Sequence, residues 1–224
     1  MTEIRAVGFD LDGTLFDHRG SAIVGVDSFV ESLGIEPSKH ARALWFTAEE
    51  EQIERWRSRR IDFQEQRRER LRTVLPALGL TAPADAAKLD ALFEGYLSGY
   101  RAAWRAFADS VELVRRVKAT GRRVGLLTNG SEQQQLDKLR VTGLLEVFDH
   151  VCISESIGVQ KPDPEAFRLL AIGLGVEPEE CLFVGDNPLH DIEGARAVGM
   201  EALLVDRYGA HREGIEDAVM AWLT

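Results

Sequence analysis

Two carboxylates stand two positions apart where an apolar run ends, at Asp10 and Asp12. The run 4–9 has the composition of a buried strand, and Gly13 lets the chain turn away after it. Alternation along an extended segment would send both carboxylates to the same side. Two like charges this close are costly unless a cation lies between them or one is protonated. The pair therefore indicates metal or acid–base chemistry, although a simple polar turn after a strand is the alternative.

A hydroxyl and a lysine could form an anion site further along the chain. Thr128 and Asn129 follow the apolar run 122–127, and the backbone N–H groups after them open onto a helix. Lys161 stands just before Pro162 and a predicted helix start, which gives its charge a fixed place. Each feature alone is also typical of an ordinary strand-to-helix turn or of a solvated loop lysine.

A second group of carboxylates follows the apolar run 181–184, at Asp186 and Asp191. Hard oxygen ligands of this type suit Mg²⁺, which keeps several waters and bridges to phosphate groups. A buried strand again delivers acids to its carboxyl end, as it does at Asp10. We therefore expect a magnesium site near these residues.

The elements that position these residues alternate between strand and helix. Five short apolar runs rich in β-branched residues lie at 4–9, 122–127, 150–153, 181–184 and 202–205. Amphipathic stretches of helical length separate the last four runs. This alternation predicts an α/β fold, a parallel sheet with helices on both faces. Near-continuous apolar strands agree, because such a sheet is buried on both sides.

The segment 17–108 interrupts the alternation, because it shows helical periodicity and no convincing strand. Its length is too great for a simple loop. We predict a core domain formed by residues 1–16 and 109–224, with residues 17–108 inserted as an all-helical domain. The expected helices of the insert lie at 21–33, 41–59, 63–78 and 86–105.

The chemistry-bearing fragments all fall at the carboxyl ends of predicted strands. Ligands of open parallel sheets bind outside this edge, at the switch point of the topology. Four independent turns would not be expected to supply two acids, a hydroxyl, a lysine and a further acid by chance. The combination predicts one active site assembled from separate parts of the chain.

At this point the sequence resembles the haloacid dehalogenase-like (HAD) hydrolases over nearly its whole length. The stretch 10–14 (DLDGT), the stretch 128–130 (TNG), Lys161 with Pro162, and the acidic stretch 185–191 are similar to the four signature motifs of that family. The helical insert is similar to the family's C1 cap. The resemblance implies a Rossmann-like doubly wound sheet with strand order 5-4-1-2-3.

The resemblance also implies catalytic roles. Asp10 would attack phosphorus and form an aspartyl-phosphate. Asp12 would protonate the leaving oxygen and then activate the hydrolytic water. Mg²⁺ would be held by Asp10, by the backbone carbonyl of Asp12 and by Asp186.

Further residues would bind the phosphoryl group or support the site. Thr128, Asn129 and Lys161 would bind the phosphoryl oxygens, and Lys161 counts with the two aspartates as catalytic. Asp191 is expected to support Lys161 or a metal-bound water. His18 and Arg19 could reach the leaving group of the substrate, although a simple helix start explains them equally well.

The expected function is a Mg²⁺-dependent phosphatase acting on a small phosphorylated metabolite. Dehalogenases that resemble this fold lack a carboxylate at the position of Asp12, so its presence favours phosphate esters. A phosphomutase of the β-phosphoglucomutase type shares that aspartate and stays an alternative. A non-catalytic phosphometabolite-binding protein is the other, although loss of Asp10 or Asp186 would be its expected mark.

The charge composition of the chain indicates which classes of binding partner are unfavourable. The 224 residues carry 37 acidic against 27 basic side chains, a formal net charge of -10. Such a charge disfavours nucleic acid and anionic membranes as partners. The two cysteines lie in apolar runs and indicate a reducing compartment, so we expect a cytoplasmic protein. The oligomeric state stays open.

Overall fold

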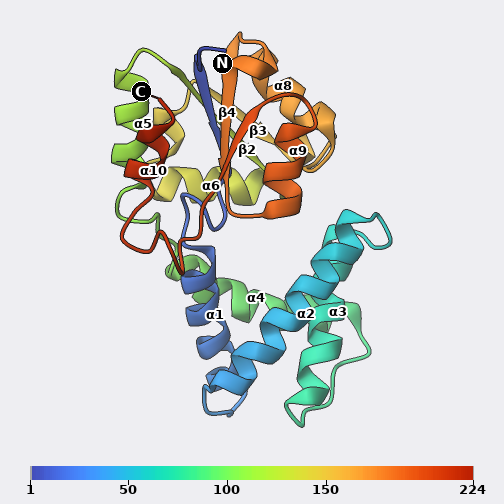
Figure 1. The fold of residues 1–224 in the computed structure, drawn as a ribbon. Coiled ribbons are helices and arrows are strands. Elements are labelled where there is room, and N and C mark those ends of the chain that lie inside the picture. The colour runs from blue at the N-terminus through green and yellow to red at the C-terminus, as the bar shows by residue number, and fades with distance from the viewer. Residues whose placement is uncertain (1, 224) are drawn as a thin grey trace. The chain divides into compact units, whose positions relative to one another are not determined.

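The protein was studied as a computed structural model that describes residues 2–223 (Figure 1). The chain divides into two compact units, one formed by Met1–His18 with Trp104–Thr224 and one formed by Arg19–Ala103. The second unit lies within the predicted insert 17–108. Among the described residues, no helix is both long and apolar enough to cross a membrane.

The first unit is built on a five-stranded parallel sheet whose strands lie in the order β3-β2-β1-β4-β5. This is the predicted order 5-4-1-2-3 read from the other edge, so the prediction of the fold is confirmed. The strands are β1 (Ala6–Phe9), β2 (Arg123–Thr128), β3 (His150–Ile153), β4 (Cys181–Gly185) and β5 (Glu201–Leu204).

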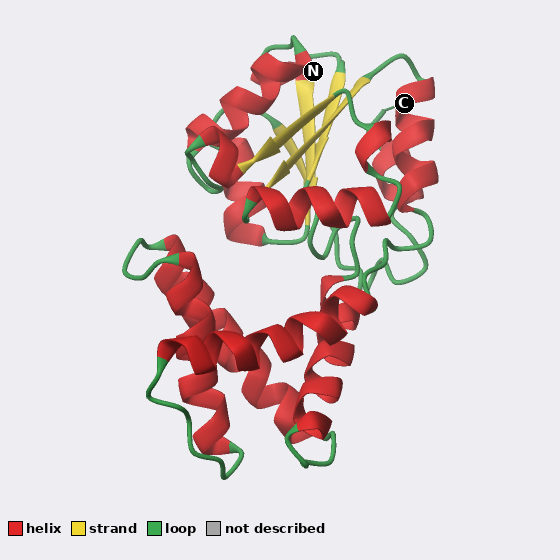
Figure 2. Cartoon of the chain, turned by 180° about the vertical axis from the view of Figure 1, so that it is seen from behind, coloured by secondary structure: helices red, strands yellow, loops and turns green. Residues whose placement is uncertain are grey.

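Helices cover both faces of the sheet because its central strands are apolar throughout. All four residues of β1 are buried, as are the five residues of β4. Figures 1 and 2 show α5 (Ser110–Ala119) and α10 (Glu216–Ala221) on one side, with α8 (Pro164–Leu174) and α9 (Gly194–Arg196) on the other. The strands were therefore predicted correctly from their apolar, buried sequences, whereas the helices α5 and α10 were not predicted.

The contact between α8 and the sheet depends on a glycine. A Cβ atom added to Gly8 of β1 would lie 2.6 Å from Leu170 and 2.9 Å from Phe183. Phe167 and Phe183 meet edge to face beside it, with ring centroids 5.1 Å apart. The small residue on β1 therefore lets the apolar side of α8 approach the sheet closely.

Buried Arg207 ties the two chain segments of this unit together. Its Nε donates to the carbonyl of Thr14 at 2.7 Å, and its guanidinium pairs with Asp109 at 2.9 Å. Thr14 follows β1, while Asp109 precedes α5. The place where the helical insert leaves and rejoins the core is thus held by one charged side chain.

The second unit contains helices and no strand among its described residues. Its helices are α1 (His18–Ser32, continuous with the end of the first unit), α2 (Lys39–Arg57), α3 (Phe63–Ala77) and α4 (Ala86–Ala102). Three of them begin at side chains that cap their first backbone N–H groups: Ser38, Asp62 and Asp85. Trp45 lies at the centre of its core, in ring contact with Phe29, Phe93 and Tyr96.

Candidate active site

The predicted catalytic fragments meet at one edge of the sheet. Phe9, the last residue of β1, pairs with Leu126 of β2 and with Val184 of β4. The three central strands therefore end at nearly the same level. Their carboxyl ends lead directly to Asp10, to Thr128 and Asn129, and to Asp186.

Buried Lys161 bridges two of the carboxylates. Its Nζ lies 2.6 Å from Oδ1 of Asp10 and 2.6 Å from Oδ1 of Asp191. The Lys161 side chain is only 3% exposed. Gly185 makes room for this arrangement, because a Cβ there would lie 2.4 Å from a carboxylate oxygen of Asp191. Asp191 thus contacts the lysine, one of the two supporting roles expected of it.

Asp12 is held by a different lysine, Lys138 of α6 (Glu132–Val141). The Lys138 ammonium lies 2.6 Å from Oδ1 and 2.8 Å from Oδ2 of Asp12. Gln135 of the same helix donates to Oδ2 of Asp12 at 3.0 Å and to the Thr128 hydroxyl at 2.6 Å. His18 is the third neighbour of this carboxylate, with its Nδ1 3.9 Å from Oδ1 of Asp12.

Asn129 uses its side chain to fix the backbone of Lys161. Its Nδ2 donates to the Lys161 carbonyl and its Oδ1 accepts from the Lys161 N–H, each at 2.9 Å. These paired bonds place the lysine relative to the end of β2. In this structure the Asn129 side chain therefore positions Lys161, and phosphate binding by Asn129 stays a prediction.

A cluster of carboxylates beside Lys161 has the character of a divalent-cation site. Ligand oxygens of Asp10, Asp186 and Asp191 all lie within 4.8 Å of one another. Oδ2 of Asp10 is buried and has no hydrogen-bond partner, so this acceptor oxygen lacks a cation or a proton to compensate its burial. With Asp12, the site holds four carboxyl groups against two lysines, so full ionisation of the four would leave two negative charges in excess. The residues present therefore fit a divalent cation.

The crowding of charge shifts the pKa values of the carboxyl groups in opposite directions. Burial, together with repulsion from Asp191 and Asp12, raises the pKa of Asp10 to about 6, although Lys161 opposes the shift. The residue Asp186 is exposed to solvent as a whole, but its carboxyl group is partly desolvated. This desolvation and the repulsion from Asp10 raise the pKa of Asp186 to about 8. Burial would raise the pKa of Asp12 as well, yet Lys138 and His18 outweigh it and lower that pKa.

Arg19, the remaining candidate, belongs to the helical unit. Its guanidinium lies over the ring of Phe46, 5.8 Å from the centroid. Both residues line a cavity of 410 Å³ within that unit, together with Lys39 and Arg42. The structure thus places His18 beside the catalytic carboxylates and Arg19 in the other compact unit.

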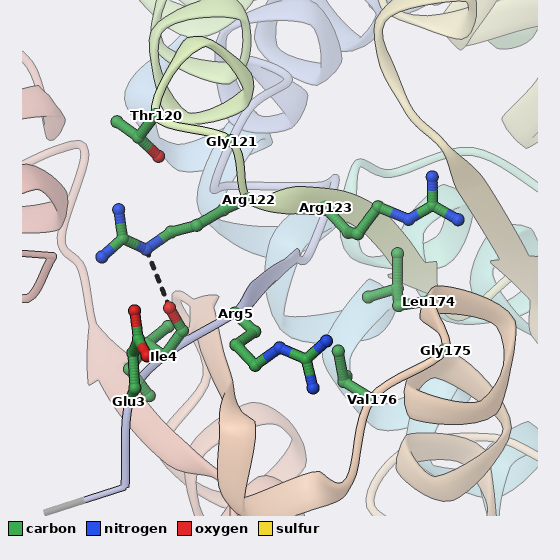
Figure 3. Close-up of a pocket in the computed structure, with 10 residues that line it drawn as sticks. All are labelled: Glu3, Ile4, Arg5, Thr120, Gly121, Arg122, Arg123, Leu174, Gly175 and Val176. Atoms are coloured by element: carbon green, nitrogen blue, oxygen red, sulfur yellow. Dashed lines mark hydrogen bonds between the residues drawn. The ribbon is translucent and has the colours of Figure 1, made fainter.

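A basic cavity lies at the opposite, amino end of the sheet (Figure 3). It has a volume of 510 Å³ and is lined by Arg5, Arg122 and Arg123 among others. Arg5 pairs with Glu180, and Arg122 donates to the carbonyl of Ile4. None of the residues singled out from the sequence lines it, so the carboxyl edge is the candidate active site.

Sequence reasoning missed Gln135 and Lys138. Their signal was present, because they share one face of α6 with buried Leu139 at helical spacing. A helix that begins beside a strand end with candidate site residues can bring its own polar side chains to the site.

The chain belongs to the haloacid dehalogenase-like hydrolase family, whose model matches residues 4–199. It is 41% identical over 101 residues to the phosphoserine phosphatase of Thermus thermophilus, a match that covers 45% of this chain. The chain spans only 41% of the length of that relative. It is also 32% identical over 214 residues to the (S)-2-haloacid dehalogenase of Pseudomonas sp. strain YL, covering 93% of this chain and 85% of the relative.

The fold is shared with solved structures of the same family. The magnesium-bound HAD-hydrolase YfnB of Bacillus subtilis superimposes with a TM-score of 0.77 at 22% identity, over 93% of this chain and 89% of the other. The relatives include a phosphatase and a dehalogenase, so the reaction must be argued from the chemistry of the site.

Gly13 offers a test of the cation site. Its φ is +92°, and a Cβ there would lie 2.1 Å from Oδ2 of Asp186. We predict that Gly13→Ala displaces Asp186 and weakens Mg²⁺ binding about tenfold or more by calorimetry. Gly34→Ala is the matched control, because Gly34 has a φ of +76° and nothing within 4 Å of an added Cβ. Both variants should lose about 1 kcal/mol of stability, and equal Mg²⁺ affinities would contradict the prediction.

The raised pKa values predict how stability depends on pH in the presence of a chelator. The pKa of both Asp10 and Asp186 is 3.8 in the unfolded chain, whereas in the folded protein it is about 6 for Asp10 and about 8 for Asp186. The folded state therefore binds more protons over this interval, and the free energy of unfolding should fall as the pH rises from about 5 to about 8. Asp186→Asn should flatten the upper half of that fall in urea titrations. A wild-type stability that rises between pH 6 and 8 would refute this.

Proposed function

We propose that this chain is a Mg²⁺-dependent phosphatase that hydrolyses a small phosphorylated metabolite through an aspartyl-phosphate on Asp10. The observation that carries the proposal is the second carboxylate, Asp12, held beside Asp10 by Lys138 and Gln135. Its support is chemical, because different leaving groups place different demands on a site that shares the nucleophile.

A halide leaves carbon as a stable anion and needs no proton. An alkoxide leaving phosphorus is strongly basic, and a general acid that protonates it lowers the barrier. Asp12 supplies a proton-carrying group next to the nucleophile, which dehalogenation would not use. The presence of this carboxylate therefore favours phosphate-ester hydrolysis over the reaction of the dehalogenase relative.

In the first step, an oxygen of Asp10 attacks phosphorus and the bond from phosphorus to the leaving oxygen breaks. The negative phosphate ester beside Asp12 favours the protonated form of that carboxyl. Asp12 passes its proton to the leaving oxygen, so that an alcohol departs and Asp12 becomes a carboxylate. Asp10 is poised for this role because Lys161 fixes its Oδ1 while its Oδ2 has no hydrogen-bond partner. The covalent intermediate divides one difficult displacement into two easier ones.

In the second step, Asp12 takes a proton from water as the water attacks phosphorus. The bond between phosphorus and the Asp10 oxygen breaks, inorganic phosphate is released and Asp12 regains its proton. Lys138 and His18 lower the pKa of Asp12, so its carboxyl is ionised at this stage, which is the form that can accept a proton.

Two side chains have donors to spare for the phosphoryl oxygens. The Lys161 ammonium has three N–H donors, and Asp10 and Asp191 engage two of them. The Thr128 hydroxyl accepts from Gln135, so its own proton is available to an anion. Mg²⁺ held by Asp10, Asp186 and the backbone carbonyl of Asp12, with Asp191 adjacent, would neutralise charge between the phosphate and the carboxylates.

The proposal predicts phosphate release that depends on both Mg²⁺ and Asp10. Wild-type protein should release inorganic phosphate from at least one member of a panel of phosphorylated metabolites, and a chelator should abolish the release. Asp10→Asn should lower kcat by about a thousandfold or more, because the amide is a poor nucleophile.

Asp217→Asn is the control, since Asp217 is an exposed aspartate on α10. It should retain wild-type rates. Phosphate release that survives in Asp10→Asn, or none from any substrate in the wild type, would overturn the proposal.

A further inference from the structure

Helix α6 carries a lysine whose burial needs an explanation. Lys138 is 1% exposed, although the sequence of its helix is mostly polar. Removing an ammonium group from water costs several kcal/mol unless a partner of opposite charge compensates. Figure 1 shows α6 lying across the end of the sheet at which the strands finish. A compensating charge for Lys138 is therefore to be sought among the carboxylates at this edge.

The partner of Lys138 is Asp12, and the contact involves both carboxylate oxygens. The Nζ atom lies 2.6 Å from Oδ1 and 2.8 Å from Oδ2, and 4.9 Å from the centroid of the Phe16 ring. Gln135, one helical turn earlier, adds a donor to Oδ2 at 3.0 Å. Donors from one helix therefore fix both the position and the plane of the Asp12 carboxylate.

The second bond of Gln135 links this carboxylate to the phosphate-binding group. Its Nε2 reaches Oγ1 of buried Thr128 at 2.6 Å. One amide group thus fixes the distance between Asp12 and Thr128. In the proposed mechanism Asp12 contacts the leaving oxygen and Thr128 contacts the phosphoryl oxygens. The catalytic lysine of the proposed mechanism, Lys161, contacts Asp10 and Asp191 instead. The two lysines therefore serve different carboxylates.

We propose that Lys138, assisted by Gln135, is a positioning residue that orients Asp12 toward the leaving-group oxygen of the phosphate ester. This inference rests on the proposed phosphatase function and assigns a role to α6 within it. Lys138 acts through Asp12, so its removal impairs proton delivery to the leaving group and spares phosphate binding. Because α6 is one rigid element, it also keeps Asp12 in register with Thr128.

The test compares substrates whose leaving groups need different amounts of help. Phosphate release by wild type and Lys138→Met is measured with 4-nitrophenyl phosphate, phenyl phosphate and an alkyl phosphate. Nitrophenolate leaves readily without a proton, whereas an alkoxide does not. The variant should lose less than about threefold in kcat/KM for the nitrophenyl ester and about a hundredfold for the alkyl ester. Inhibition by inorganic phosphate should stay within about threefold of wild type.

A double-mutant cycle separates action through Asp12 from a general structural effect. Asp12→Asn should show the same dependence on the leaving group, and adding Lys138→Met to it should cause little further loss. Lys118→Met is the matched control. Lys118 of α5 also forms an ion pair, with Asp149 at 2.8 Å, but it contacts none of the proposed catalytic residues. That control should behave as wild type. If Lys138→Met does not melt cooperatively, Lys138→Gln, which keeps a donor, is tested by the same criteria.

The outcomes distinguish the inference from the function on which it rests. Equal losses of kcat/KM for all three esters, additive losses in the cycle, weakened phosphate inhibition or faster turnover of the alkyl ester would each overturn the role of Lys138 while leaving the phosphatase intact. Absence of phosphate release from every ester and from the metabolite panel by the wild type would overturn both.

Discussion

Repulsion among carboxylates gathered at one edge of a sheet is the constraint on which this site depends. Asp10, Asp12, Asp186 and Asp191 converge at a partly desolvated edge of the sheet, where like charges interact strongly. Two buried lysines make the assembly tolerable, each with its own carboxylates. Full ionisation of the four carboxyl groups would leave two negative charges in excess, and this excess suits the site to a divalent cation.

The fold delivers this charge balance from separate parts of the chain. Aligned parallel strands place Asp10 and Asp186 side by side, while Lys161 arrives from the segment before α8 and Lys138 from α6. The lysines also serve different carboxylates, because Lys161 contacts Asp10, the proposed nucleophile, and Lys138 contacts Asp12, the proposed acid–base group. Membership of the hydrolase family establishes the scaffold, and this division of charge supports phosphate-ester chemistry on it.

The sequence predicted the features that local pattern determines. Apolar runs located the five strands, and acids at their ends, together with the family resemblance, indicated Asp10, Asp12 and Asp186. What it did not reveal depends on tertiary contacts. Gln135 and Lys138 resemble surface residues of a polar helix until the helix is placed against the strand ends. The bonds from the Asn129 amide to the Lys161 backbone are likewise visible only in the structure, and phosphate binding by Asn129 stays a prediction.

The central claim is that Asp10 carries the phosphoryl group between the two chemical steps. The most direct measurement is to quench the wild-type protein with acid within milliseconds of mixing it with its best substrate and Mg²⁺, and to map modified peptides by mass spectrometry. The account predicts one added phosphoryl group, located on Asp10, that disappears as inorganic phosphate forms. Phosphate release with no phosphorylated Asp10 at any time, or with the group on another residue, would contradict it.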